Sequence, residues 1–118
     1  NQFIQRDMDC QEGKRRLGET PRDKFPFILE HKKIITDLPY AVCGTGDNFL
    51  PEQCPIEEVD VEDMEAYAFA KVCLFENIDF ISIKYITNAM DDTANSDWDN
   101  SVISSANSFY NYFKKILA

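Results

Sequence analysis

The chain has no long hydrophobic run, no paired-cysteine motif and only one histidine. No segment approaches the roughly 18 consecutive apolar residues of a membrane-spanning helix, so we expect no membrane span. No secretion signal opens the chain and the four cysteines form no C-x-x-C pair, which favours reduced thiols and a cytoplasmic location. His31 lies beside Lys32 and Lys33 in a polar stretch, where we expect no catalytic role. The acids, cysteines and histidine show no metal-ligand spacing, so neither a metal nor another cofactor is expected.

Basic side chains are in the minority, because 12 Lys and Arg stand against 21 Asp and Glu, for a formal net charge of −9. Such a charge repels the phosphates of nucleic acids and the surfaces of anionic membranes, so neither is an expected partner. Hydrophobic residues make up 44% of the sequence and nine of them are Phe, which is enough for a packed core. We therefore expect residues 1–118 to form a single globular domain.

The apolar pattern predicts alternating strands and helices. The expected strands are residues 2–5, 40–43, 59–61 and 80–86. The expected helices are a short one at 27–33, a buried one that is apolar almost all round at 63–75, and an amphipathic one at 96–116 with Ser96 as its N-cap. This order predicts an α/β fold with a largely parallel sheet.

Three short segments follow predicted strands, at residues 46–50, 63–65 and 87–88. Ligands gather at the carboxyl ends of parallel strands, so these segments mark a candidate site. Glu65 stands at the start of an apolar helix, where it can bind sugar hydroxyls or be an exposed first-turn acid, and the sequence supports both interpretations equally.

Two further side chains at these positions suit a purine but have simpler explanations. Asn88 offers a donor and an acceptor to a purine edge, although an asparagine that forms a turn after a strand is at least as well supported. Phe49 can stack on a base, but a lone Phe is more typical of a core.

Taken together, the motifs resemble the methylthioadenosine/S-adenosylhomocysteine nucleosidases of the nucleoside phosphorylase superfamily. Residues 61–73 (VEDMEAYAFAKVC) are similar to the family's Met-Glu helix start, and residues 44–50 (GTGDNFL) to its base-binding turn. Residues 83–88 (IKYITN), with Asp91 and Asp92, resemble its next strand and catalytic loop. Residues 5–9 (QRDMD) match the segment that opens the second half of the domain.

The resemblance implies the C-terminal half of a three-layer αβα phosphorylase/hydrolase-like fold with a mixed, largely parallel sheet. The first half of that domain supplies the opening strands, the acid that activates water in the nucleosidases and the phosphate-binding groups of the phosphorylases. We therefore expect a truncated domain that is completed by an N-terminal half or by homodimerisation. Residues 11–16 are polar where some members carry apolar residues that cover the partner's active site, so this contribution is not expected here.

By position, the resemblance also implies the roles of five substrate-binding residues. Phe49 would stack on the purine, and the backbone of Leu50 would hydrogen-bond the base edge. Met64 would pack under the ribose, and Glu65 would bind its hydroxyls. Asp63 falls where many members carry another acid.

Asn88 occupies the position of the catalytic residue at the purine N7. The adenine-specific nucleosidases have an aspartic acid there that donates a proton to N7, which an amide cannot do. Phosphorylases of 6-oxopurines and futalosine hydrolases resemble this chain in having Asn, whose amide can bridge N7 and the 6-oxo group. The resemblance thus implies a purine nucleosidase of the methionine-salvage type, acting on methylthioadenosine, S-adenosylhomocysteine or a 6-oxopurine nucleoside. The alternatives are a phosphorylase that uses phosphate, an inactive nucleoside-binding fragment and a purely structural unit.

Overall fold

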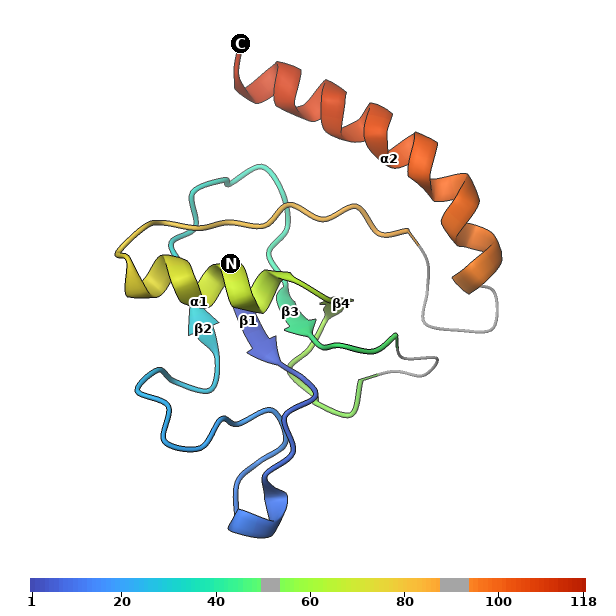
Figure 1. The fold of residues 1–118 in the computed structure, drawn as a ribbon. Helices are drawn as coiled ribbons and strands as arrows, with labels where there is room; N and C mark the ends of the chain where they lie inside the picture. Colours follow the sequence, from blue (N-terminus) through green and yellow to red (C-terminus); the bar gives the residue numbers. More distant parts are fainter. Residues whose placement is uncertain (50–53, 88–93) are drawn as a thin grey trace. The chain divides into compact units, whose positions relative to one another are not determined.

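The computed structural model of the chain describes residues 1–49, 54–87 and 94–118, with only the backbone described at 94–99 (Figure 1). The described residues form two compact units, of which the first contains residues 1–49 and 54–82 and the second contains residues 83–87 and 94–118. Within the described residues, no helix is both long enough and apolar enough to cross a membrane.

A mixed four-stranded sheet with the order β2-β1-β3-β4 forms the centre of the first unit (Figure 1). Its strands are β1 (Gln2–Gln5), β2 (Leu29–Glu30), β3 (Val42–Thr45) and β4 (Val61–Asp63). β3 pairs in parallel with both β1 and β4, whereas β2 runs antiparallel to β1. The predicted α/β class with a mixed, largely parallel sheet is therefore confirmed.

Helix α1 (Ala66–Phe75) packs against β1, β2 and β3 and closes the core of this unit (Figure 1). The side chains of Phe3 and Leu29 are 1% and 0% exposed, as the loss of apolar surface to water requires of a core. The other buried members of this cluster are Cys43, Ala66, Tyr67 and Ala70.

The predicted strand at 2–5 is confirmed as β1, but the predicted strands at 40–43 and 59–61 both begin two residues too early. Parallel pairing of Cys43 with Val61 sets the register of β3 and β4. Asp60 lies just before this ladder and is held to its first residue by two hydrogen bonds. The Asp60 carboxylate accepts from the Val42 backbone N–H (2.8 Å), and the Asp60 N–H donates to the Val42 carbonyl (2.9 Å).

The predicted helix at 27–33 is wrong, because Leu29–Glu30 forms the edge strand β2. Phe3 pairs with Leu29 across the antiparallel ladder, and the His31 backbone N–H donates to the Asn1 carbonyl at 3.0 Å. Burial of Leu29 against α1 decides the conformation here, since tertiary contacts readily override the weak propensity of a short segment.

The predicted helix at 63–75 begins three residues later than expected, at Ala66, and it is not buried all round. Ala66, Tyr67 and Ala70 face the sheet, whereas the side chains of Phe69 and Val72 are 61% and 60% exposed. The prediction of a fully buried helix is therefore wrong for the structure as described.

The predicted strand at 80–86 is also wrong, because the structure assigns none of these residues to a strand. The amphipathic helix of the second unit is confirmed as α2 (Ala94–Ile116). Ser96 lies inside α2, so its prediction as the N-cap is wrong. Within this unit, Ser101 Oγ donates to the Thr87 carbonyl at 2.6 Å, and the rings of Tyr85 and Phe109 meet with centroids 6.4 Å apart.

Candidate functional site

The carboxyl ends of β1, β3 and β4 meet at one edge of the sheet, because the three strands run in parallel. Backbone hydrogen bonds continue beyond the ladder and tie these ends together. The Arg6 N–H donates to the Thr45 carbonyl at 2.9 Å, and the Gly46 N–H donates to the Asp63 carbonyl at 3.1 Å. Two of the predicted site segments, at 46–49 and 63–65, therefore lie side by side at this edge.

The junction between β4 and α1 is fixed by a hydrogen-bonded pair, Thr45 and Asp63. Thr45 Oγ1 donates to Asp63 Oδ1 at 2.5 Å and accepts from the Tyr67 backbone N–H at 3.0 Å. Asp63 Oδ2 accepts from the Ala66 backbone N–H at 3.1 Å. These bonds satisfy two of the free N–H groups at the start of α1, so the Asp63 carboxylate is engaged by the protein itself.

Met64 and Glu65 follow this anchor and face solvent, with the Met64 side chain 50% exposed. Glu65 occupies the N-cap position of α1 but makes no capping hydrogen bond with its side chain. Within the described ranges its carboxylate also forms no ion pair. It stands at the positive end of the helix dipole, where an anionic hydrogen-bond acceptor is favoured.

Phe49 ends the turn that follows β3, and its side chain is 58% exposed. The backbone of this turn is held from the end of β1: Asp7 Oδ2 accepts from the Asp47 N–H at 2.7 Å, and the Arg6 guanidinium donates to the Asn48 carbonyl. Phe49 is therefore not a core residue of the first unit, and an exposed ring on an anchored turn is suited to stacking.

Below the turn lies a buried charge cluster that the sequence did not reveal. Arg6 Nε lies 3.7 Å from Glu62 Oε2, and the two side chains are 4% and 10% exposed. Burial raises the pKa of Glu62, and the nearby Arg6 charge opposes this shift only in part. Burial likewise raises the pKa of the Cys54 thiol beside it. All four cysteines of the chain are free thiols.

Two predicted site residues, Leu50 and Asn88, lie outside the described residues. Phe49, Asp63, Met64 and Glu65 all belong to the first unit, and the structure brings them to one sheet edge.

His31 is a buried structural residue, only 6% exposed, although its neighbours in the sequence are polar. Its Nδ1 accepts from the Phe80 backbone N–H at 3.2 Å, which leaves the proton on Nε2 to be donated to the Ala70 carbonyl at 2.9 Å. Both ring nitrogens are thus used in joining β2, α1 and the segment after α1.

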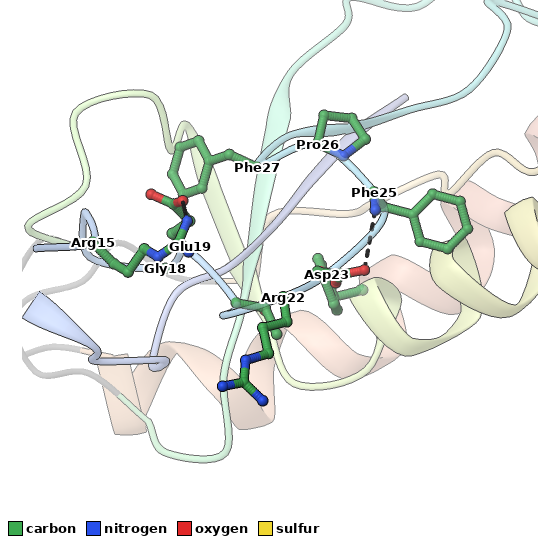
Figure 2. A pocket seen from close by; sticks show the side chains of 10 residues that line it. Arg15, Gly18, Glu19, Arg22, Asp23, Phe25, Pro26 and Phe27 are labelled. Carbon is green, nitrogen blue, oxygen red and sulfur yellow. Dashed lines mark hydrogen bonds and ion pairs between the residues drawn. The ribbon is translucent and has the colours of Figure 1, made fainter. Parts of the chain in front are cut away.

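A separate cavity of about 310 Å³ lies under the loop between β1 and β2 (Figure 2). Its charged groups are largely paired, since Arg15 binds Glu19 at 2.8 Å and Asp23 forms an ion pair with Lys71. Asp23 also accepts from the Phe25 backbone N–H at 3.1 Å, drawn as a dashed line in Figure 2. None of the predicted site residues lines this cavity.

Across the part of the chain that the structure describes, no group of three or more His, Cys, Asp or Glu side chains is arranged to hold a metal ion.

Comparison with known protein families identifies the superfamily of the chain. No curated protein and no solved structure is significantly similar to the chain. The family model of the phosphorylase superfamily matches residues 30–118, which is more than half of the chain and includes the segments at 46–49 and 63–65. The predicted superfamily is confirmed, while the closer likeness to the methylthioadenosine/S-adenosylhomocysteine nucleosidases stays a prediction. The chain belongs to the phosphorylase superfamily and has a nucleoside-processing function in general.

Proposed function

We propose that the chain cleaves the N-glycosidic bond of a purine nucleoside, with water as the acceptor. The observation that carries this proposal is that an exposed ring, Phe49, and an exposed carboxylate, Glu65, lie in the segments that follow the neighbouring parallel strands β3 and β4. A nucleoside has a flat base and a sugar with hydroxyl donors, so its site needs both a stacking surface and a hydrogen-bond acceptor.

In this mechanism Phe49 stacks on the purine and Met64 packs under the ribose. Glu65 accepts hydrogen bonds from the ribose hydroxyls and, as an anion, also stabilises the positive charge that develops on the sugar. The bond between the base nitrogen and C1′ breaks and its electron pair leaves with the purine. The water oxygen bonds to C1′, and the proton that this oxygen loses ends on the departing purine. The backbone of Leu50 fixes the base edge.

Asn88 is proposed to bind the purine N7 through its side-chain amide. An amide donates a hydrogen bond but no proton, so it stabilises the negative charge of the departing base without neutralising it. This chemistry favours a 6-oxopurine nucleoside over adenine nucleosides such as methylthioadenosine or S-adenosylhomocysteine. The same amide favours the second candidate, a module that binds nucleosides without cleaving them.

Release of the free base tests the proposal. Inosine, guanosine, methylthioadenosine and S-adenosylhomocysteine are each incubated with the protein, with and without inorganic phosphate. We expect base release without phosphate, and fastest from inosine or guanosine. Release only with phosphate would identify a phosphorylase, and tight binding without release would identify a binding module. A folded protein that neither binds nor cleaves any of the four contradicts the nucleoside site.

We also propose that the working form contains a second polypeptide, either another copy or a chain that supplies the first half of the superfamily domain. Large apolar side chains on α1 support this proposal, because Phe69 and Val72 are more than half exposed. Size-exclusion chromatography with light scattering should give a dimer or a larger assembly. A stable, monodisperse monomer contradicts this part of the account.

A further inference from the structure

We propose that Arg6 is a positioning residue that holds the turn at 46–49 in place for the purine, an inference that rests on the proposed nucleoside site. Arg6 follows β1 directly and is 6% exposed, so its guanidinium lies beneath the sheet edge rather than in solvent. A side chain this buried acts on a nucleoside through the residues that it holds.

The guanidinium packs against the backbone of the turn. It donates a hydrogen bond from Nη2 to the Asn48 carbonyl, one residue before Phe49. It also fills the space beside Gly46, where an added Cβ would lie 2.6 Å from Nη1 and clash. A residue with a side chain at Gly46 would therefore displace either the guanidinium or the turn.

Three successive residues of the turn are each anchored by a different group. Gly46 donates to the carbonyl of Asp63, Asp47 donates to the carboxylate of Asp7, and Asn48 accepts from Arg6. The Arg6 bond is the last of these before Phe49. Among the described residues, its loss leaves Asp47 as the last anchored residue before the ring.

The ion pair between Arg6 and Glu62 is better suited to fixing the position of the guanidinium than to stabilising the fold. Arg6 Nε and Glu62 Oε1 are buried with no hydrogen-bond partner among the described residues. A buried pair with incomplete hydrogen bonding contributes little net stability, because desolvation offsets much of the attraction. Its clear effect is to fix the guanidinium between β4 and the turn.

The test combines hydrogen exchange with nucleoside binding in the intact chain. Arg6→Met removes the anchor, and the double variant Arg6→Met with Glu62→Met also removes the uncompensated buried carboxylate, so that folding is protected. Arg15→Met is the matched control, because Arg15 forms an exposed ion pair away from the turn.

We expect faster amide exchange at residues 46–48 in the double variant, with β1, β3 and α1 still protected. The Kd for inosine should rise about tenfold, the usual effect of losing one hydrogen bond from a charged group. In a Phe49→Ala background the same substitutions should leave the Kd unchanged, because the effect passes through the ring. Arg15→Met should match the wild type in both measurements.

If the amides at 46–48 exchange as slowly in the double variant as in the wild type, the role of Arg6 is overturned. Faster exchange spread evenly over the sheet overturns it too. A full tenfold rise in the Kd for inosine in the Phe49→Ala background overturns the role of Arg6 as well. If the wild-type chain binds no nucleoside, the proposed function fails, while the exchange experiment still decides whether Arg6 holds the turn.

Discussion

The hydroxyl of Thr45 donates a 2.5 Å hydrogen bond to Asp63 and thereby joins the ends of β3 and β4. The same oxygen accepts from the Tyr67 backbone N–H, so one side chain fixes both a strand end and the start of a helix. Met64 and Glu65 lie between these two anchored points. The geometry of the candidate site therefore depends on a residue that is not itself predicted to bind the substrate.

Replacing Thr45 by Val keeps the shape of the side chain and removes its hydroxyl. The hydrogen bonds of Thr45 to Asp63 and from the Tyr67 N–H are then lost, and we expect the free energy of unfolding to fall by about 1–2 kcal/mol. Urea denaturation measures this loss. Thr36→Val, at an exposed position, is the control and should change stability little. Equal stability of the two variants would show that the anchor contributes nothing.

Replacing Phe49 by Ala should weaken nucleoside binding without unfolding the protein. The ring is 58% exposed, so little buried surface is lost, whereas stacking on a base contributes about 1–3 kcal/mol. Calorimetric titration with inosine should show a Kd raised about tenfold or more. Tyr110→Ala is a matched control, because that ring is 67% exposed on α2. An unchanged Kd for Phe49→Ala removes the stacking role.

The buried carboxyl of Glu62 should make stability depend on pH. Burial raises its pKa in the folded state, while the unfolded chain keeps the ordinary value of about 4.3. The unfolded state therefore releases this proton first, and folding is favoured at low pH. The stability that Glu62 contributes should be fully present below its ordinary pKa and should be lost as pH rises through its raised pKa.

Urea denaturation of the wild type and of Glu62→Gln across that pH range isolates this contribution. Relative to the variant, the free energy of unfolding of the wild type should decrease with rising pH. Glu57→Gln, at an exposed position, should leave the pH dependence unchanged. A wild-type advantage that grows with pH would mean that Arg6 outweighs burial.

Local patterns in the sequence are enough to predict β1, α1 and α2: β1 contains a short apolar run, α1 is apolar along most of its length, and α2 has apolar residues at helical spacing. The edge strand β2 is missed, since a two-residue strand has no period and forms only through pairing with β1. Residues 80–86 are predicted as a strand but form none. A β-branched apolar run favours a strand, but it does not by itself provide a neighbouring strand with which to pair.

The common sheet edge of the segments that contain Phe49, Met64 and Glu65 could be anticipated, because parallel strands carry their following residues to one edge. The roles of Thr45, Arg6 and Glu62 could not be anticipated from the sequence. Each depends on contacts between segments far apart in the sequence, and no local spacing marks a side chain that caps a helix or pairs beneath a turn.

The most direct test of the account is purine-base release from inosine by the wild type and by Glu65→Gln, with Glu76→Gln at the other end of α1 as the control. Gln keeps the shape of the side chain but loses the anionic acceptor for the ribose hydroxyls. The account predicts that Glu65→Gln lowers kcat/KM about a hundredfold, equivalent to roughly 3 kcal/mol, while both variants stay folded. Equal rates for the wild type and Glu65→Gln would contradict a nucleoside site at the ends of β3 and β4.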